Sequence, residues 1–88
     1  MDTKQKKLVG GWKSIEVTDT VKELADYVIS ENNIKSPINE VFNAASQVVS
    51  GKNYRFQILL ENDELWAAQV YVNIHKEHSI TAFKQINI

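Results

Sequence analysis

TVKELADYVISENN, residues 20–33, is the stretch of this sequence that decides the fold. Its apolar residues recur at the spacing of one face of an α-helix: Val21, Leu24, Ala25, Val28 and Ile29. Thr20 followed by Glu23 fits a capping box, in which each side chain accepts a hydrogen bond from an otherwise unpaired amide. Asn32–Asn33 and Pro37 predict the end, since asparagine tolerates left-handed backbone and proline cannot continue a helix. The stretch therefore predicts one amphipathic helix.

Two later segments alternate apolar and polar residues at every second position. The first runs from Tyr54 to Leu60 and the second from Trp66 to Val72, and this period is typical of strands with one buried face. The polar residues 61–64 between them predict a hairpin turn. Core packing on the buried faces accounts for Phe56 and Trp66.

Further strands are predicted on either side of this pair. One spans about 39–49 and turns at 50–53, and the last spans 80–88 after a loop at 73–79. A short strand over 12–17 precedes the helix. One helix followed by meandering strands gives an antiparallel sheet, whose apolar face only the helix can cover. The predicted fold class is therefore α+β, with an antiparallel sheet of four to five strands wrapped around one long α-helix.

Length and composition indicate a single small domain. The 88 residues are 43% hydrophobic and 24% charged, so residues 1–88 are predicted to form one domain, with residues 1–9 as a flexible arm. The chain has no cysteine, which favours a reducing, cytoplasmic setting. Residues 1–7 lack the apolar segment of a signal peptide, and no apolar run is long enough to cross a membrane. A net charge of −1 with mixed signs argues against nucleic-acid binding.

The sequence predicts no catalytic or metal-binding arrangement. Ser46 and Ser50 have no recognisable activating base. His75 and His78 form a His-x-x-His pair, but further ligands are missing, so we expect two exposed loop histidines. We therefore expect no enzyme activity, no metal and no cofactor.

Several short motifs occur in order along the chain. Gly10–Gly11 precedes the helix, and Gln47-Val48-Val49-Ser50-Gly51 reads Gln-x-Val-x-Gly between the first two strands after it. Gln69–Val72 and Phe83–Lys84 follow. With the helix text LADYV, these motifs resemble the cystatin family, close to its disulfide-free members of the stefin and plant types, over about residues 8–86. The resemblance implies a cystatin-like fold.

The resemblance also implies a function. Members of this family are reversible, tight-binding inhibitors of papain-like cysteine proteases, cathepsins included, and occlude the active-site cleft with an N-terminal arm and two hairpin loops. Stiff β-branched side chains suit such contacts at low entropic cost. No scissile peptide is presented to the catalytic thiolate, so the inhibitor is not cut. Carried over to this chain, the protease-binding residues are Leu8, Val9, Gly10, Gly11, Gln47, Val48, Val49, Ser50, Gly51, Asn73, Ile74 and His75.

The second hairpin departs from the family pattern. Many members carry Pro-Trp there, whereas this chain has Asn73-Ile74-His75-Lys76. Because tryptophan is a frequent interface hot spot, its absence bears on affinity and on the choice of target.

Two alternatives to a monomeric inhibitor stay open. The first is a non-inhibitory binding module with the same fold, natural or engineered as a scaffold. The second is a domain-swapped dimer, favoured by strain at Val49 in the tight hairpin. Swapping would remove the binding wedge, so the inhibitory form is predicted to be a monomer. Trp12, beside the glycines, is a candidate to brace the arm.

Overall fold

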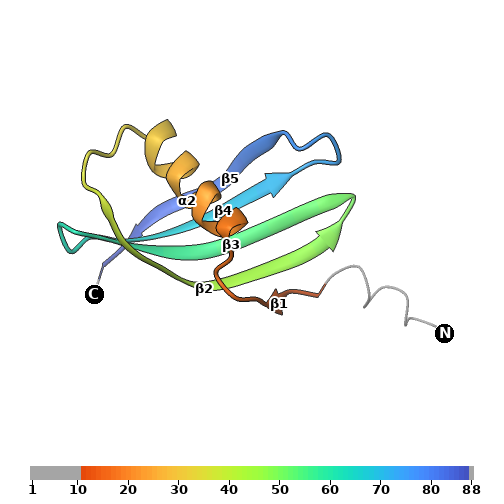
Figure 1. The fold of residues 1–88 in the computed structure, drawn as a ribbon, viewed down its shortest axis with the longest axis horizontal. Coiled ribbons are helices and arrows are strands. Elements are labelled where there is room, and N and C mark those ends of the chain that lie inside the picture. The colour runs from red at the N-terminus through yellow and green to blue at the C-terminus, as the bar shows by residue number, and fades with distance from the viewer. Residues whose placement is uncertain (1–10, 88) are drawn as a thin grey trace.

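The computed structural model describes residues 11–87, so the predicted arm of residues 1–9 lies outside the described part of the chain. The strands form one antiparallel sheet in the order β1-β2-β3-β4-β5, and a single helix crosses one of its faces (Figure 1). The predicted α+β fold is confirmed. In chain order the elements are β1 (Lys13–Ser14), α2 (Asp19–Glu31), β2 (Ile38–Val49), β3 (Gly51–Leu60), β4 (Leu65–Val72) and β5 (His78–Ile86).

The helix α2 is capped by Thr18. This residue has extended backbone (φ −88°, ψ 176°), and its hydroxyl accepts a hydrogen bond from the amide of Val21 at 3.4 Å. The predicted capping box of Thr20 and Glu23 is wrong, because Thr20 already lies inside the first turn. The start at Thr18 places Asp19 in that turn, where the helix dipole favours a carboxylate.

The helix ends at the asparagines, as predicted. Asn33 adopts left-handed backbone with φ 56°. Its amide donates to the carbonyl oxygen of Ser30 at 3.1 Å, and the amide of Ile34 donates to that of Ile29 at 3.2 Å. These two bonds make a Schellman motif, which satisfies carbonyl groups that the helix leaves unpaired. The chain then turns back towards β2, and Ile34 packs against the core.

The core lies between α2 and the sheet. Alternate residues of β3 and β4 face the helix, as the period of two predicts. Trp66 packs against this core and stacks on Phe83, with 4.4 Å between ring centroids. The buried residues of the helix and of the two central strands are Val21, Leu24, Ala25, Val28, Ile29, Phe56, Ile58, Leu60, Ala68 and Val70.

The turn between β2 and β3 is tighter than the predicted turn over 50–53. Val49 pairs with Gly51, which leaves Ser50 alone at the tip. The left-handed backbone falls on Gly51, with φ 97°, and Val49 has no positive φ. The strain expected at Val49 is therefore not seen in its backbone, and domain swapping stays a prediction without that support.

The strands differ from the prediction in their boundaries and in the register of β2. The first strand, β1, covers only two residues of the predicted 12–17, and β5 already begins at His78. The register of β2 shifts at Asn43, which has φ 54°, and as a result Ala44 and Ala45 are both buried. Among the residues described, no helix is long and apolar enough to span a membrane.

Candidate binding edge

Three large apolar side chains stand exposed in the described part of the chain. Val48 is 60% exposed and Val49 is 37% exposed at the end of β2, and Ile74 is 68% exposed in the loop between β4 and β5. Both loops lie at the same end of the sheet (Figure 1). We call residues 47–51 and 73–77 together the binding edge. Because these three side chains lie at one end of the sheet, that end is the candidate contact surface.

Gly51 brings the two loops of the binding edge into close approach. Its φ of 97° is one that residues with a side chain rarely adopt. A Cβ atom at this position would collide with the carbonyl oxygen of Val72, and it would lie 3.0 Å from Cα of Asn73. Only glycine lets the tip of the first hairpin rest against the end of β4.

A hydrogen bond from Tyr71 fixes this arrangement. Its hydroxyl donates to the carbonyl oxygen of Ser50 at the hairpin tip. The register of β3 and β4, which pairs Asn53 with Tyr71, places the ring next to the tip. The prediction from sequence missed Tyr71, because its partner is a backbone atom that only the strand register brings near.

Gln47 braces the first hairpin from within. Its Oε1 accepts a hydrogen bond of 2.8 Å from Nδ2 of Asn53 on the opposite strand, and the two residues face each other in the register. The side chain is half-buried. Of the residues predicted for this hairpin, Val48 and Val49 are thus the ones that present apolar surface outward.

Asn73 organises the second loop. Its Oδ1 accepts hydrogen bonds of 2.9 Å from the amides of His75 and Glu77, and its Nδ2 donates to Oε1 of Glu77 at 2.8 Å. Lys76 completes the turn with φ 70° and donates its amide to the carbonyl oxygen of Asn73 at 2.9 Å. These bonds leave Ile74 exposed on an ordered loop. The loop lacks the proline of the family pattern, and Asn73 supplies the order instead.

The N-terminal segment of the predicted site is only partly described. Leu8, Val9 and Gly10 lie outside the described residues. Gly11 is described and exposed. Because β1 is antiparallel to β2, with Lys13 opposite Ser46 and Ser14 opposite Ala45, Lys13 is the residue of β1 nearer to the binding edge. The predicted neighbourhood of the arm and the first hairpin stays a prediction.

The two histidines occupy different kinds of position. His75 lies in the second loop as predicted, but His78 is the first residue of β5. The ring of His78 meets the ring of Tyr27 on the helix edge to face, with centroids 5.1 Å apart. Within residues 11–87, no group of three or more potential ligands that could hold a metal ion is found.

Trp12 packs against Arg55, not against a core residue. The guanidinium carbon lies 4.3 Å from the centroid of the indole ring, a cation–π contact. Arg55 pairs with Ala45 on β2, which pairs in turn with Ser14 on β1. Trp12 therefore fastens the start of β1 to the sheet face opposite the helix.

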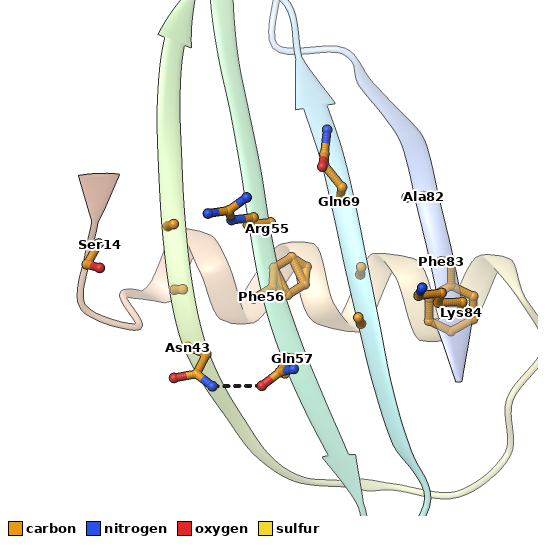
Figure 2. A pocket seen from close by; sticks show the side chains of 13 residues that line it. Ser14, Asn43, Arg55, Phe56, Gln57, Gln69, Ala82, Phe83 and Lys84 are labelled. Atoms are coloured by element: carbon orange, nitrogen blue, oxygen red, sulfur yellow. Dashed lines mark hydrogen bonds between the residues drawn. The ribbon is translucent and has the colours of Figure 1, made fainter. Parts of the chain in front are cut away.

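A shallow hollow of about 670 Å³ lies on that outer face of the sheet (Figure 2). Asn43 and Gln57 are joined across it by a hydrogen bond of 2.7 Å. The only hydroxyl group in its lining belongs to Ser14, and the lining contains no carboxylate and no histidine. Lys84 is the one amine in the lining, and it lies on β5, at the opposite edge of the sheet from Ser14 on β1.

The sheet, the single helix and the paired loops define the class of small cystatin-like proteins. The sequence matches the cystatin domain over residues 10–87, so the chain belongs to the cystatin family, a family of cysteine protease inhibitors. The absence of cysteine agrees with its disulfide-free members.

A solved structure supports the same fold. The crystal structure of a salivary cystatin from the soft tick Ornithodoros moubata superimposes with a TM-score of 0.74 at 19% sequence identity. The alignment covers 89% of this chain and 98% of the tick protein. No curated protein matches the sequence.

Proposed function

We propose that this chain is a reversible, tight-binding inhibitor of papain-like cysteine proteases, which it blocks by inserting the binding edge into the active-site cleft. The observation that carries the proposal is the gathering of Val48, Val49 and Ile74 at one edge. Membership of the cystatin family gives the class of partner. Leu8 and Val9 would add contacts in the subsites next to the cleft.

The binding edge suits this task because it is ordered before binding. Gly51 and the Tyr71 hydrogen bond hold the first loop against the second, and Asn73 orders the second. Little conformational entropy is then lost on association. Full burial of a fully exposed valine or isoleucine is worth about 1.5 to 3 kcal/mol, and Val48, Val49 and Ile74 gain less because each is already partly buried.

The protein blocks the protease without taking part in chemistry. The hairpin tip presents side chains of valine to the cleft and directs the Ser50 carbonyl oxygen to Tyr71, so the catalytic thiolate meets no peptide bond placed for attack. Binding is therefore reversible, and the inhibitor leaves the cleft uncut. We propose accordingly that the chain is not an enzyme and that it acts as a monomer.

The test replaces Val48 and Val49 together by aspartate. The double variant keeps the circular dichroism spectrum of the wild type, because both side chains are exposed, and it loses inhibition of papain. Asn39→Asp with Asn87→Asp is the matched control, since both residues are exposed and lie away from the binding edge. Retained inhibition by the valine variant would rule out this loop as the contact surface.

A second candidate function is a binding module of the same fold without inhibitory activity. The observation that favours this alternative is the loop Asn73-Ile74-His75. It has one aliphatic side chain at the place where many cystatins carry a tryptophan. A folded monomer that leaves papain fully active would support this alternative.

A further inference from the structure

The molecule measures 50 × 30 × 20 Å along its principal axes. Its charged side chains are distributed unevenly along the longest of them. Three exposed lysines lie in or beside the binding edge: Lys76 in its second loop, Lys52 directly after its first loop, and Lys13 on β1. Glu77 is the one carboxylate among the described residues of this end, and it accepts a hydrogen bond from Asn73. With both histidines counted as neutral, this end is net positive.

The opposite end of the sheet is acidic. It comprises the end of α2, the start of β2 and the turn between β3 and β4, which Figure 1 places away from the two hairpin tips. The ten residues of β3 separate the two ends, a span of about 30 Å. The carboxylates of this end are Glu31, Glu40, Glu61, Asp63 and Glu64, and its one lysine is Lys35.

Two of the three lysines in or beside the binding edge lie next to its apolar side chains. Lys52 pairs with Val48 across the first hairpin and with Val72 on β4, and Lys76 belongs to the same loop as Ile74. The surface therefore combines exposed apolar side chains with neighbouring cations, a mixture that protein–protein interfaces use. Rim charges act mainly on the rate and orientation of association.

We propose that the binding edge and the lysines beside it form a basic surface that fits cysteine proteases whose clefts have acidic residues around the rim. This inference rests on the proposed function and specifies the kind of target. The acidic end of the inhibitor is repelled by such a rim and the basic end is attracted, so the molecule approaches the cleft with the binding edge first. The apolar centre favours a protein cleft over nucleic acid, which needs stacking platforms within a basic groove.

The test uses papain in two forms. In one, the lysines and arginines nearest the cleft rim are replaced by glutamate, and in the other the aspartates and glutamates nearest the rim are replaced by lysine. Association rate constants with the wild-type inhibitor are measured by stopped-flow at ionic strengths of about 0.01 M and about 0.15 M, where the screening lengths are about 30 Å and about 8 Å. We expect the acidic form to associate faster at low salt and to slow as salt is added. We expect the basic form to show the opposite trend.

Matched variants assign the effect to the binding edge. Lys52→Gln with Lys76→Gln should lower the low-salt association rate with the acidic form about fivefold and change the dissociation rate little. Lys35→Gln with Lys84→Gln removes the same charge from exposed positions elsewhere and should not slow association to that extent. Equal rates for both forms of papain, or equal effects of the two variants, would overturn this inference while inhibition itself persists. Absence of binding to either form would overturn the proposed function and this inference with it.

Discussion

The hydroxyl of Tyr71 donates a hydrogen bond to the carbonyl oxygen of Ser50, and this bond joins the tip of the first hairpin to the strand that leads into the second. The two loops of the binding edge therefore form one unit. A protease that meets this unit encounters Val48, Val49 and Ile74 in fixed relative positions. Mutations that remove the contacts holding the two loops should therefore weaken binding.

Tyr71→Phe removes the hydroxyl and keeps the ring. The lost hydrogen bond to Ser50 is worth about 1 kcal/mol, so we expect inhibition of papain to weaken about fivefold. Amide hydrogen exchange at Gly51 and Lys52 should become faster. Tyr54→Phe, in the middle of β3, serves as the control and should leave both readouts unchanged. Unchanged exchange at the tip of the Tyr71 variant would contradict the account.

Gly51→Ala introduces a side chain where the backbone has φ 97° and the carbonyl oxygen of Val72 is in the way. A residue with a Cβ atom costs about 1 to 2 kcal/mol in this conformation, and the collision adds to that cost. We expect a lower midpoint in urea unfolding together with weaker inhibition. Gly11→Ala is the control for stability, since no positive φ occurs there, and it should leave the midpoint close to that of the wild type.

Asn73→Ala removes the side-chain hydrogen bonds to His75 and Glu77. The second loop should lose its order, seen as faster amide exchange at both residues, and papain should dissociate more quickly. Asn62→Ala is a matched control, because Asn62 accepts a similar bond from Glu64 in the turn at the far end of the sheet. Equal loss of inhibition in both variants would show that the second loop has no special part in binding.

Thr18→Ala removes the side chain that caps α2. The loss of an N-cap costs about 0.5 to 2 kcal/mol, so we expect a clear fall in the free energy of unfolding. Thr20→Ala acts inside the helix, where alanine is the better helix former, and should be neutral or stabilising. Urea unfolding of the two variants shows which threonine caps the helix. A larger loss of unfolding free energy for Thr20→Ala than for Thr18→Ala would contradict a helix start at Thr18.

Periodicity predicted the helix and the paired central strands because burial on one face leaves a direct pattern in sequence. The cap was misplaced, since Thr18 and Thr20 are both acceptable caps and only the path of the chain from β1 decides between them. The shift in β2 at Asn43 was also missed. A residue with φ 54° there breaks the period of two on which the prediction depended.

Some residues of the candidate site could be predicted from the sequence, and others could not. The motif from Gln47 to Gly51 and the exposed Ile74 could be predicted from the resemblance, as could the need for glycine at the turn. Tyr71 and the hydrogen-bonding role of Asn73 could not, because both depend on atoms that approach only in the folded sheet. The position of Lys13, Lys52 and Lys76 at one end of the sheet also needed the fold, since these residues lie far apart in the sequence.

Inhibition by the intact protein is measured by titrating active papain with the purified, folded monomer while following hydrolysis of a fluorogenic peptide. We expect activity to fall to zero near one inhibitor per enzyme and to return on dilution, and we expect the inhibitor to be recovered uncut. Full papain activity in the presence of excess folded monomer, or recovery of the inhibitor cleaved at the first hairpin, would contradict the proposed function.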